Sequence, residues 1–551
     1  MSETLISEPP VATQSDTMPL PKNDIVWWKG AVIYQIYPRS FKDSNGDGVG
    51  DIPGIIEHLD HVASLGLDGI WLSPFFTSPM ADFGYDIADF CDVDPVFGTL
   101  ADFDRLIEKA HSLSLKVIID QIYSHSSDQH AWFEESRQNR TNPKADWYVW
   151  ADANPDGTPP NNWQSVFGMG AWQWDARRGQ YYLHNFLVEQ PDLNLHNAEV
   201  QEAILNITRF WLERGVDGFR LDALNFSMHD PELKNNPVET VFKRPPTRPF
   251  DFQRHINSMS HPDIPKFLER IRAVMNEYSG RFTVAEVGGP FPMVEMKAFT
   301  KGDKRLNSAY AFDFLYAADL SAELIKETLS EWPGEKNEGW PSWAFSNHDA
   351  PRAITRWRGT CDEDQYAKLL AAILVSFRGN IFVYQGEELG LPQADVPFED
   401  LQDPEAITNW PETLGRDGAR TPMPWDKAYC CAGFSTKKPW LPIDERHLSK
   451  TVVAQNNDEN SVLNFYRRAL SLRKESSAIR FGDIEFIDTT SDLLLIKRYT
   501  RSETRLCAFN LTDKAQTLPN AFEVEIDISV GSTEVKNGEL PAYSGFISKA
   551  L

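Results

Sequence analysis

Eight short apolar runs, separated by segments with helical periodicity, constrain the fold of this chain more than any other feature. Each run has the length and the apolar character of a buried β-strand. The runs begin at residues 31, 68, 116, 216, 282, 309, 343 and 380. Eight strand and helix units over about 450 residues fit a (β/α)8 barrel better than a doubly wound sheet, which seldom has so many consecutive repeats. We therefore predict an α/β fold built on a (β/α)8 (TIM) barrel.

The segments between the runs carry helix signals. Thr99 is a suitable N-cap for a helix whose apolar residues share one face over residues 100–110. A second apolar stripe, over residues 200–211, is followed by Gly215, a residue type that commonly ends helices. Helices that alternate with strands in this way are what a parallel barrel requires.

The predicted barrel is interrupted once and is followed by a different pattern. The stretch 126–190 is rich in Asn, Pro, Trp and Gly and is predicted to be an excursion domain inserted after the third strand. Over residues 479–551, short alternating strands follow one another without helices, which predicts a C-terminal antiparallel β-sandwich. The barrel then comprises residues 23–125 and 191–478, and residues 1–22 are a flexible extension.

The charge balance restricts the partners of this chain. Aspartate and glutamate number 80 against 54 lysines and arginines, so the formal net charge is −26. A field of this sign repels phosphate backbones and anionic membrane surfaces, which argues against nucleic acid and membrane partners. No apolar run approaches the length of a transmembrane helix, and residues 1–22 lack the pattern of a signal peptide. We expect a cytoplasmic protein, a monomer or a homodimer, that acts on small molecules.

The cysteines are odd in number and show no metal-ligand spacing, which indicates free thiols in a reducing compartment. We expect them to fill the hydrophobic core. They are Cys91, Cys361, Cys430, Cys431 and Cys507.

Three carboxylates follow strand-like runs: Asp222, Glu286 and Asp349. Because the chemistry of such a barrel takes place at the carboxyl ends of its strands, we expect them to converge at one mouth. Their mutual repulsion raises at least one pKa and prepares that group to donate a proton near neutral pH. Glycoside hydrolysis uses such a pair of carboxyl groups. The alternative is that each carboxylate caps a loop or pairs with an arginine.

Six ordered motifs lie at or near the ends of the predicted strands. They are DQIYSH (120–125), QPDLN (190–194), GFRLDALN (218–225), AEVG (285–288), SNHD (346–349) and YQGEELG (384–390). With these motifs the chain resembles the α-amylase family of glycoside hydrolases, family 13, and within it the bacterial α-glucosidases and oligo-1,6-glucosidases. The resemblance covers about residues 26–550.

The resemblance implies a role for each carboxylate. Asp222 corresponds to the nucleophile that forms a covalent glucosyl ester, Glu286 to the general acid and then base, and Asp349 to the stabiliser of the transition state. Arg220 stands two residues before Asp222, on the same face of the strand, and is expected to keep that carboxylate ionised.

Further residues resemble sugar contacts of the family. His125 and His348 correspond to the pair that hydrogen-bonds sugar hydroxyls, and Tyr85 to the platform that stacks on the sugar face. Asp86 is expected to bind the terminal hydroxyls together with Arg416. An Asp and Arg fork that closes the site accepts only a chain end, which implies exo action.

Two assignments stay open at the sequence level. Arg420 competes with Arg416 for the role of the sugar-binding arginine. Phe167 and Phe186 resemble aromatic walls of the site, but either can equally be a core residue.

The stretch DSNGDGVGD places oxygen ligands at alternate positions. Asp43, Asn45, Asp47 and Asp51, with the carbonyl of Val49, form the hard donor set that Ca²⁺ or Mg²⁺ prefers. The loop starts like an EF-hand but has glycine at the twelfth position, where an EF-hand has glutamate. It resembles the single-ion loop of the oligo-1,6-glucosidases, so we predict one structural divalent cation and no organic cofactor. A plain Asx-rich turn is the alternative.

Ala223 follows the predicted nucleophile, at a position where family members that favour α-1,6 links commonly have valine. It therefore indicates α-1,4 substrates such as maltose and short maltooligosaccharides, with transfer of glucose to alcohols or sugars. The resemblance as a whole implies a retaining, exo-acting α-glucosidase. Sucrose hydrolysis or isomerisation and oligo-1,6-glucosidase activity are alternatives, and a non-catalytic interaction scaffold is a remote one.

Overall fold

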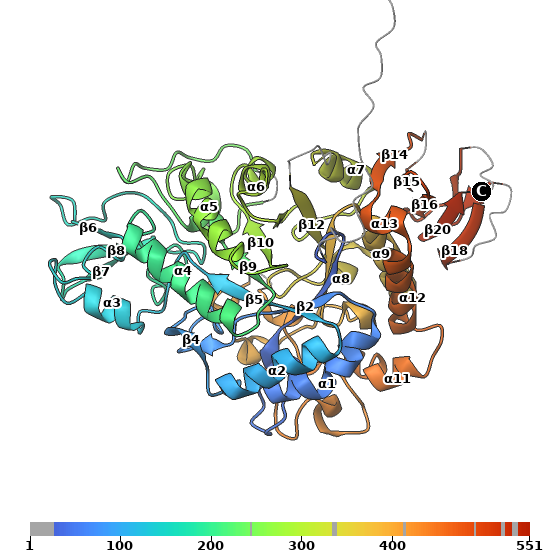
Figure 1. The fold of residues 1–551 in the computed structure, drawn as a ribbon, viewed down its shortest axis with the longest axis horizontal. Coiled ribbons are helices and arrows are strands. Elements are labelled where there is room, and N and C mark those ends of the chain that lie inside the picture. Colours follow the sequence, from blue (N-terminus) through green and yellow to red (C-terminus); the bar gives the residue numbers. More distant parts are fainter. Residues whose placement is uncertain are drawn as a thin grey trace, which may run out of the picture.

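The computed structural model describes residues 27–242, 245–332, 339–411, 415–489, 492–519, 524–531 and 538–550. The predicted N-terminal extension, residues 1–22, lies outside the described residues. At the centre stands an eight-stranded barrel, with a three-stranded sheet at one end of the molecule and a larger antiparallel sheet at the other (Figure 1).

The barrel closes because β1 pairs with β2 on one side and with β13 on the other, and every pair of neighbouring strands is parallel. The strand order around it is β1-β13-β12-β11-β10-β9-β5-β2. The strands are β1 (Val32–Ile36), β2 (Gly69–Leu72), β5 (Lys116–Ile122), β9 (Gly218–Asp222), β10 (Phe282–Val287), β11 (Ser308–Ala311), β12 (Trp340–Ala344) and β13 (Asn380–Tyr384). Each predicted run supplies one of these strands, so the (β/α)8 barrel is confirmed.

Side chains that point into the barrel form a core of their own. It includes Ile33, Trp71, Ile118, Val284, Tyr310 and Phe382. At the amino-terminal end of the strands, the rings of Trp27 and Trp28 lie 5.8 and 5.6 Å from the ring of Phe282 and cover that end. The barrel is therefore filled, and the carboxyl ends of its strands are left for chemistry.

Helices surround the barrel (Figure 1). Thr99 caps α2 as predicted: its side chain accepts a hydrogen bond from the Asp102 amide, and the Asp102 carboxylate accepts one from the Thr99 amide. The helices are α1 (Ile52–Ser64), α2 (Leu100–Ser112), α3 (Ala131–Ser136), α4 (Ala198–Glu213), α5 (Ile264–Met275), α6 (Pro292–Thr300), α7 (Ala322–Ser330), α8 (Ala353–Trp357), α9 (Glu363–Ser376), α10 (Pro404–Thr408), α11 (Val452–Asn456), α12 (Val462–Glu475) and α13 (Ser477–Phe481). Within the described ranges, no helix combines the length and the apolar character needed to cross a bilayer.

Between β5 and α4 the chain leaves the barrel. It forms α3 and a three-stranded antiparallel sheet of β6 (Trp150–Ala151), β8 (Gln180–Leu183) and β7 (Trp172–Asp175). A small aromatic core of its own holds this sheet together, with Trp163 stacked on Trp172. A short two-stranded sheet of β3 (Phe76–Thr77) and β4 (Asp89–Val93) follows β2.

The C-terminal part contains the predicted antiparallel sheet. Its strands, in spatial order, are β14 (Asp483–Phe486), β15 (Leu493–Tyr499), β16 (Thr504–Asn510), β20 (Ser544–Ala550) and β18 (Val524–Val530). A two-stranded ribbon of β17 (Gln516–Thr517) and β19 (Glu539–Leu540) packs on one face of it through Leu518 and Leu540. The start of the region differs from the prediction, because Ser476 caps α13 and residues 477–481 are helical.

Candidate active site

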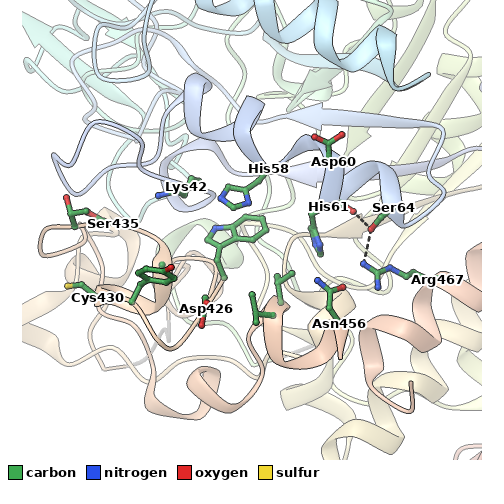
Figure 2. Close-up of a pocket in the computed structure, with 16 residues that line it drawn as sticks. Lys42, His58, Asp60, His61, Ser64, Asp426, Cys430, Ser435, Asn456 and Arg467 are labelled. Atoms are coloured by element: carbon green, nitrogen blue, oxygen red, sulfur yellow. Dashed lines mark hydrogen bonds between the residues drawn. The ribbon is translucent and has the colours of Figure 1, made fainter. Parts of the chain in front are cut away.

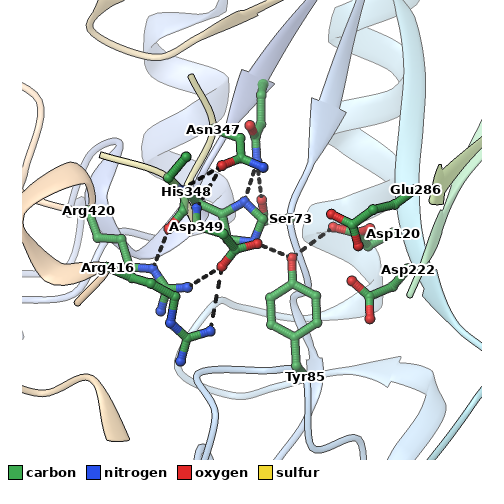
Figure 3. Close-up of polar contacts among 12 residues, drawn as sticks. Ser73, Tyr85, Asp120, Asp222, Glu286, Asn347, His348, Asp349, Arg416 and Arg420 are labelled. Atoms are coloured by element: carbon green, nitrogen blue, oxygen red, sulfur yellow. Dashed lines mark hydrogen bonds and ion pairs between the residues drawn. The ribbon is translucent and has the colours of Figure 1, made fainter. Parts of the chain in front are cut away.

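The three predicted catalytic carboxylates lie at the carboxyl ends of barrel strands. Asp222 ends β9, Glu286 lies near the end of β10 and Asp349 follows β12. Ala223 adopts a left-handed conformation (φ 40°), and its amide donates a hydrogen bond to Glu286 Oε2 (3.1 Å). The turn after β9 thereby ties Asp222 to Glu286, and Asp349 lies across from them, beyond Tyr85 (Figure 3).

One guanidinium, that of Arg220, holds carboxylates from three strands. It is fully buried and contacts Asp120 (2.8 Å), Asp222 and Glu286 (2.6 Å). Its Nε donates to the Tyr310 hydroxyl (3.1 Å). Asp120 was not among the predicted site residues, although the motif DQIYSH begins with it. The pairing of β5 with β9 places Asp120 opposite Arg220, so knowledge of the strand register would have selected it.

Burial sets the protonation of this cluster. It raises the pKa of Asp222 to about 7 and the pKa of Glu286 to about 7, against the opposing charge of Arg220. Arg220 favours the ionised form of Asp222, as expected, but burial outweighs it. Both carboxyl groups therefore titrate near neutral pH.

Asp349 has the opposite electrostatic environment. Burial opposes its ionisation, but the charges of Arg420 (2.7 Å) and Arg416 (3.5 Å) outweigh burial and hold the pKa of its carboxyl well below the usual range. Burial also lowers the pKa of His348 to about 3, so this ring is neutral near pH 7 and the two guanidiniums supply the positive charge. Asp349 is therefore a carboxylate throughout the neutral range.

His348 connects the two halves of the site. The rings of Tyr37 and Tyr85 both stack with it, at 5.6 and 5.5 Å between centroids. The side-chain nitrogen of Gln35 lies 2.8 Å from Nδ1, and the Tyr85 hydroxyl contacts Nε2. The same hydroxyl lies 3.3 Å from Asp120 (Figure 3). Tyr85 thus links the Arg220 cluster with His348, and its role as a platform for the sugar stays a prediction.

The predicted pair of Asp86 and Arg416 is wrong. Asp86 is fully buried and accepts hydrogen bonds from the Ser78 hydroxyl (3.0 Å) and from the amides of Ala81 (2.8 Å) and Asp82 (2.9 Å). Its oxygens hold the turn that follows β3. A carboxylate whose oxygens accept three local hydrogen bonds is a structural group of that turn.

Arg416 pairs instead with Asp82, four residues earlier than the predicted partner, at 2.8 Å. It also contacts Asp403 (2.7 Å) and Asp349 (3.5 Å). Arg420 contacts Asp349 and donates to the carbonyl oxygen of His348 (2.7 Å). Both arginines that sequence analysis left in competition therefore reach Asp349. Asp82 and Asp403 are additions that the sequence pattern did not provide.

The predicted aromatic walls lie beside these groups. The Arg416 guanidinium lies 5.2 Å from the centroid of the Phe167 ring. Phe186 lies 5.0 Å from the His125 ring and 6.1 Å from the Phe167 ring. His125 is buried, with Nε2 3.1 Å from the Tyr85 carbonyl oxygen. The excursion segment thus brings Phe167 and Phe186 to the mouth, next to His125 and Arg416.

In the loop with the predicted cation ligands, the side chains accept hydrogen bonds from the backbone amides of the same loop. Asp43 accepts hydrogen bonds from the amides of residues 45, 46 and 48 and from the Ser435 hydroxyl, and Asp51 caps α1. Asn45 and Asp47 are exposed and accept from the amides two residues further along. In the described part of the chain, no cluster of three or more His, Cys, Asp or Glu side chains has metal-binding geometry. These are the contacts of an Asx-rich turn, and cation binding stays a prediction.

Comparison with known proteins agrees with this geometry. A family model described as "Alpha amylase, catalytic domain" matches residues 35–482. A "Probable alpha-glucosidase" of Rhizobium meliloti (strain 1021) is 51% identical, covering 97% of this chain and 98% of that protein. An oligo-1,6-glucosidase of Parageobacillus thermoglucosidasius is 38% identical, covering 87% and 88%. Among solved structures, the alpha-glucosyl transfer enzyme XgtA has a TM-score of 0.91 at 51% identity, covering 95% of this chain and 99% of that chain.

The family match begins at residue 35, within β1, and continues through the other seven barrel strands and the three carboxylates. The relatives cover nearly the whole chain at identities well above those that show a fold alone. This chain belongs to the α-amylase family of glycoside hydrolases.

Proposed function

We propose that this enzyme is a retaining, exo-acting α-glucosidase that releases α-glucose from the non-reducing end of maltose and short α-1,4-glucosides. The observation that carries the proposal is the bridge that Arg220 makes between Asp222 and Glu286 through its two terminal nitrogens. Carboxylates on one guanidinium are close together, as in retaining enzymes, whose two carboxyl groups are about 5 Å apart. Inverting enzymes separate them by roughly 6.5–9.5 Å to admit a water molecule.

The proposed reaction has two displacements. Asp222 attacks the anomeric carbon while Glu286 gives its proton to the glycosidic oxygen, and the bond to the leaving sugar breaks. Glu286 then takes a proton from water, which displaces Asp222 and releases glucose with its configuration retained. The hydroxyl of Tyr310 (3.2 Å) and the amide of Ala223 orient Glu286 for both steps. The ionised Asp349 stabilises the positive charge that develops on the sugar.

Exo action is supported by the group around Arg416. Asp82 and Asp403 fix its guanidinium with charge-assisted hydrogen bonds, and Phe167 covers it. Such a fixed cluster of donors and acceptors suits the several hydroxyls of a terminal glucose. We infer that a longer chain cannot continue past this cluster.

Substitution of each carboxylate by an amide distinguishes the role of Asp82 from that of Asp86. Because Asp82 pairs with Arg416, we expect Asp82→Asn to lower kcat/KM for maltose by about 10–100-fold, mainly through KM. Because Asp86 holds a turn, we expect Asp86→Asn to lower the free energy of unfolding by about 1–3 kcal/mol and to leave kcat/KM within about twofold. Steady-state kinetics and thermal unfolding of both variants check this. A kinetic loss confined to Asp86→Asn would restore the sequence-based assignment.

The experiment that tests the proposed function is a proton NMR time course with maltose. Early α-glucose, before mutarotation, is the expected signal, since it reports retention and cleavage of an α-1,4 link. Early β-glucose would mean inversion and would exclude the covalent mechanism. No turnover of maltose would direct the search to sucrose and isomaltose, the substrates of the alternative activities.

Transfer of glucose to other acceptors is part of the proposal, because water and an alcohol attack the same ester on Asp222. The XgtA similarity supports it, since that structure is described as an alpha-glucosyl transfer enzyme. Maltose with added glycerol is expected to give glucosyl glycerol beside free glucose. If free glucose is the only product, transfer is excluded for this acceptor.

The preference for α-1,4 links rests on Ala223. Ala223 has a left-handed backbone directly after Asp222, and we infer that its single methyl group lies next to the leaving sugar. Ala223→Val adds bulk there and, because β-branched residues resist positive φ, shifts the turn that carries the Glu286 hydrogen bond. We expect the ratio of kcat/KM for maltose to that for isomaltose to fall by about tenfold. An unchanged ratio would separate linkage preference from this residue.

We also propose that the loop 43–51 holds one divalent cation, Ca²⁺ or Mg²⁺, because its oxygens are hard donors. A chelator is then expected to lower the Tm, and CaCl₂ or MgCl₂ to restore it. At ~100-fold excess of the cation over Kd, binding adds about 2–3 kcal/mol to the free energy of unfolding. The rate well below Tm is expected to stay constant, since the catalytic carboxylates lie outside this loop. A Tm that responds to neither treatment would leave the Asx-rich turn as the better description.

A further inference from the structure

Three of the five cysteines depart from the expectation that they fill the core. Cys361 and Cys507 are buried as expected, whereas Cys91 and Cys431 are half-buried and Cys430 is exposed. Cys430 and Cys431 are adjacent in the chain, and their Sγ atoms lie 3.2 Å apart. All five are free thiols in the structure. The adjacent pair is therefore an accessible dithiol on the surface of the barrel.

The backbone around the pair has an unusual conformation. Cys431 and Ala432 both have φ 50°, and Gly433 has φ 78°, so three consecutive residues lie in the left-handed region. Non-glycine residues adopt this region rarely and at a cost. This turn allows adjacent thiols to meet. Cys431 Sγ also donates to the carbonyl oxygen of Lys437 (3.1 Å), which fixes the second thiol.

Cys430 is open to small solutes. It lines a cavity of about 790 Å³ between α1 and residues 425–467. Figure 2 shows Cys430 at the edge of this cavity, on the side of Ser435 and away from Arg467. Trp425, which is stacked on His58 at 3.8 Å, also lines the cavity. A small oxidant can therefore reach Cys430 without any movement of the chain.

The turn that carries the dithiol is bonded to the loop predicted to hold a cation. The carbonyl oxygen of Ala432 accepts hydrogen bonds from the amide of Trp425 (2.8 Å), and that of Phe434 accepts from the amide of Asp43 (3.0 Å) and from Lys42 Nζ (3.2 Å). A covalent change at Cys430 and Cys431 therefore acts on groups that position Asp43.

We propose that Cys430 and Cys431 are a modification site at which a hydroperoxide forms a reversible disulfide between neighbouring residues. The Cys430 thiolate attacks the hydroperoxide, the O–O bond breaks, and a sulfenic acid and an alcohol (or water) are formed. The sulfur of Cys431 then attacks Cys430 Sγ, the S–S bond forms and water leaves. In sum, two thiols and one hydroperoxide give one disulfide, one alcohol and one water.

Exposure and burial assign the order of the two steps. Burial raises the pKa of the Cys431 thiol to about 11, so this sulfur is protonated near neutral pH and is the weaker nucleophile toward the oxidant. The exposed Cys430 is the sulfur that meets the oxidant first. A trans peptide sets adjacent Cα atoms about 3.8 Å apart, below the ~4.4 Å minimum of ordinary disulfides, so the product is strained and easily reduced.

Peptide mapping of the full chain tests the proposal. After limited exposure to hydrogen peroxide, we expect Cys430 and Cys431 to lose reactivity with N-ethylmaleimide together, about tenfold faster than Cys91. Dithiothreitol is expected to restore both, and the protein to stay free of intermolecular disulfides. Loss of one thiol without the other, linkage between two chains, or a rate equal to that of Cys91 would overturn the proposal.

Two serine variants distinguish the roles of the sulfurs. In Cys431→Ser the sulfenic acid at Cys430 has no partner, so a dimedone adduct at Cys430 is expected to accumulate. In Cys430→Ser the dimedone adduct is expected to be absent at Cys431. Serine is close in size to cysteine, and an unchanged Tm of both variants shows that the turn is intact. Equal adducts in both variants would overturn the assigned order, and no adduct in either would overturn the reaction itself.

Discussion

Asp222→Asn is expected to lower kcat for maltose by about 10⁴-fold or more. An amide cannot form the glucosyl ester, although asparagine keeps the shape of the side chain and its contact with Arg220. We therefore expect maltose still to bind, which calorimetry with the variant measures directly. An unchanged Tm shows that the loss is chemical. Turnover within about tenfold of wild type would remove Asp222 from the reaction.

A second variant at the same position identifies the attacking group by stereochemistry. Asp222→Gly leaves space for azide on the face from which Asp222 attacks, so an activated glucoside with azide is expected to give β-glucosyl azide. The matched control is Glu286→Ala, in which Asp222 still forms the ester and azide displaces it to give the α-azide. An α-azide from the Asp222 variant would assign the nucleophile to another residue.

Glu286→Gln is expected to lower kcat/KM for maltose by about 10²–10⁴-fold, because the leaving sugar then departs without a proton. The loss is expected to be far smaller for 2,4-dinitrophenyl α-glucoside, whose leaving group needs no protonation. The ratio of the two losses is the measurement, and it is insensitive to the amount of folded enzyme. Equal losses on both substrates would mean that Glu286 does not act as the proton donor.

The pH profile follows from the same two groups. Asp222 must be ionised, so kcat/KM falls as the pH drops below about 7, and Glu286 must be protonated, so kcat/KM falls as the pH rises above about 7. Because both pKa values lie near 7, the acidic and the alkaline limb meet close to neutrality. Glu286→Gln is expected to lose the alkaline limb and to retain the acidic one. An alkaline limb that persists in the variant would assign it to another group.

The barrel was predictable because each strand is buried on both faces, and its sequence is therefore a continuous apolar run. The carboxylates were predictable for a related reason: a polar residue that closes such a run lies at the mouth. Asp222 and Glu286 are set by strand geometry. The helix that replaces the start of the predicted sandwich was not visible, because five residues carry too little periodicity.

The errors in the site have a common physical origin. Asp82 and Asp86 lie in the same turn, and the choice between them depends on which carboxylate the local amides occupy. Arg416 and Asp403 come from a distant part of the chain, so their contact with Asp82 is a property of tertiary packing. The contact of Arg220 with Asp120 was missed for the same reason, since it joins different strands of the barrel.

The aromatic residues that cover the amino-terminal end of the barrel have a kinetic consequence. With Trp27 and Trp28 packed on Phe282 and the interior filled, the reaction centre has no passage along the barrel axis. In the proposed double displacement, the departing sugar and the incoming water or alcohol therefore use the same entrance at the barrel mouth, one after the other. Double-reciprocal plots with maltose as donor and glycerol as acceptor should therefore give parallel lines. This is the pattern of ping-pong kinetics, in which the first product leaves before the second substrate binds.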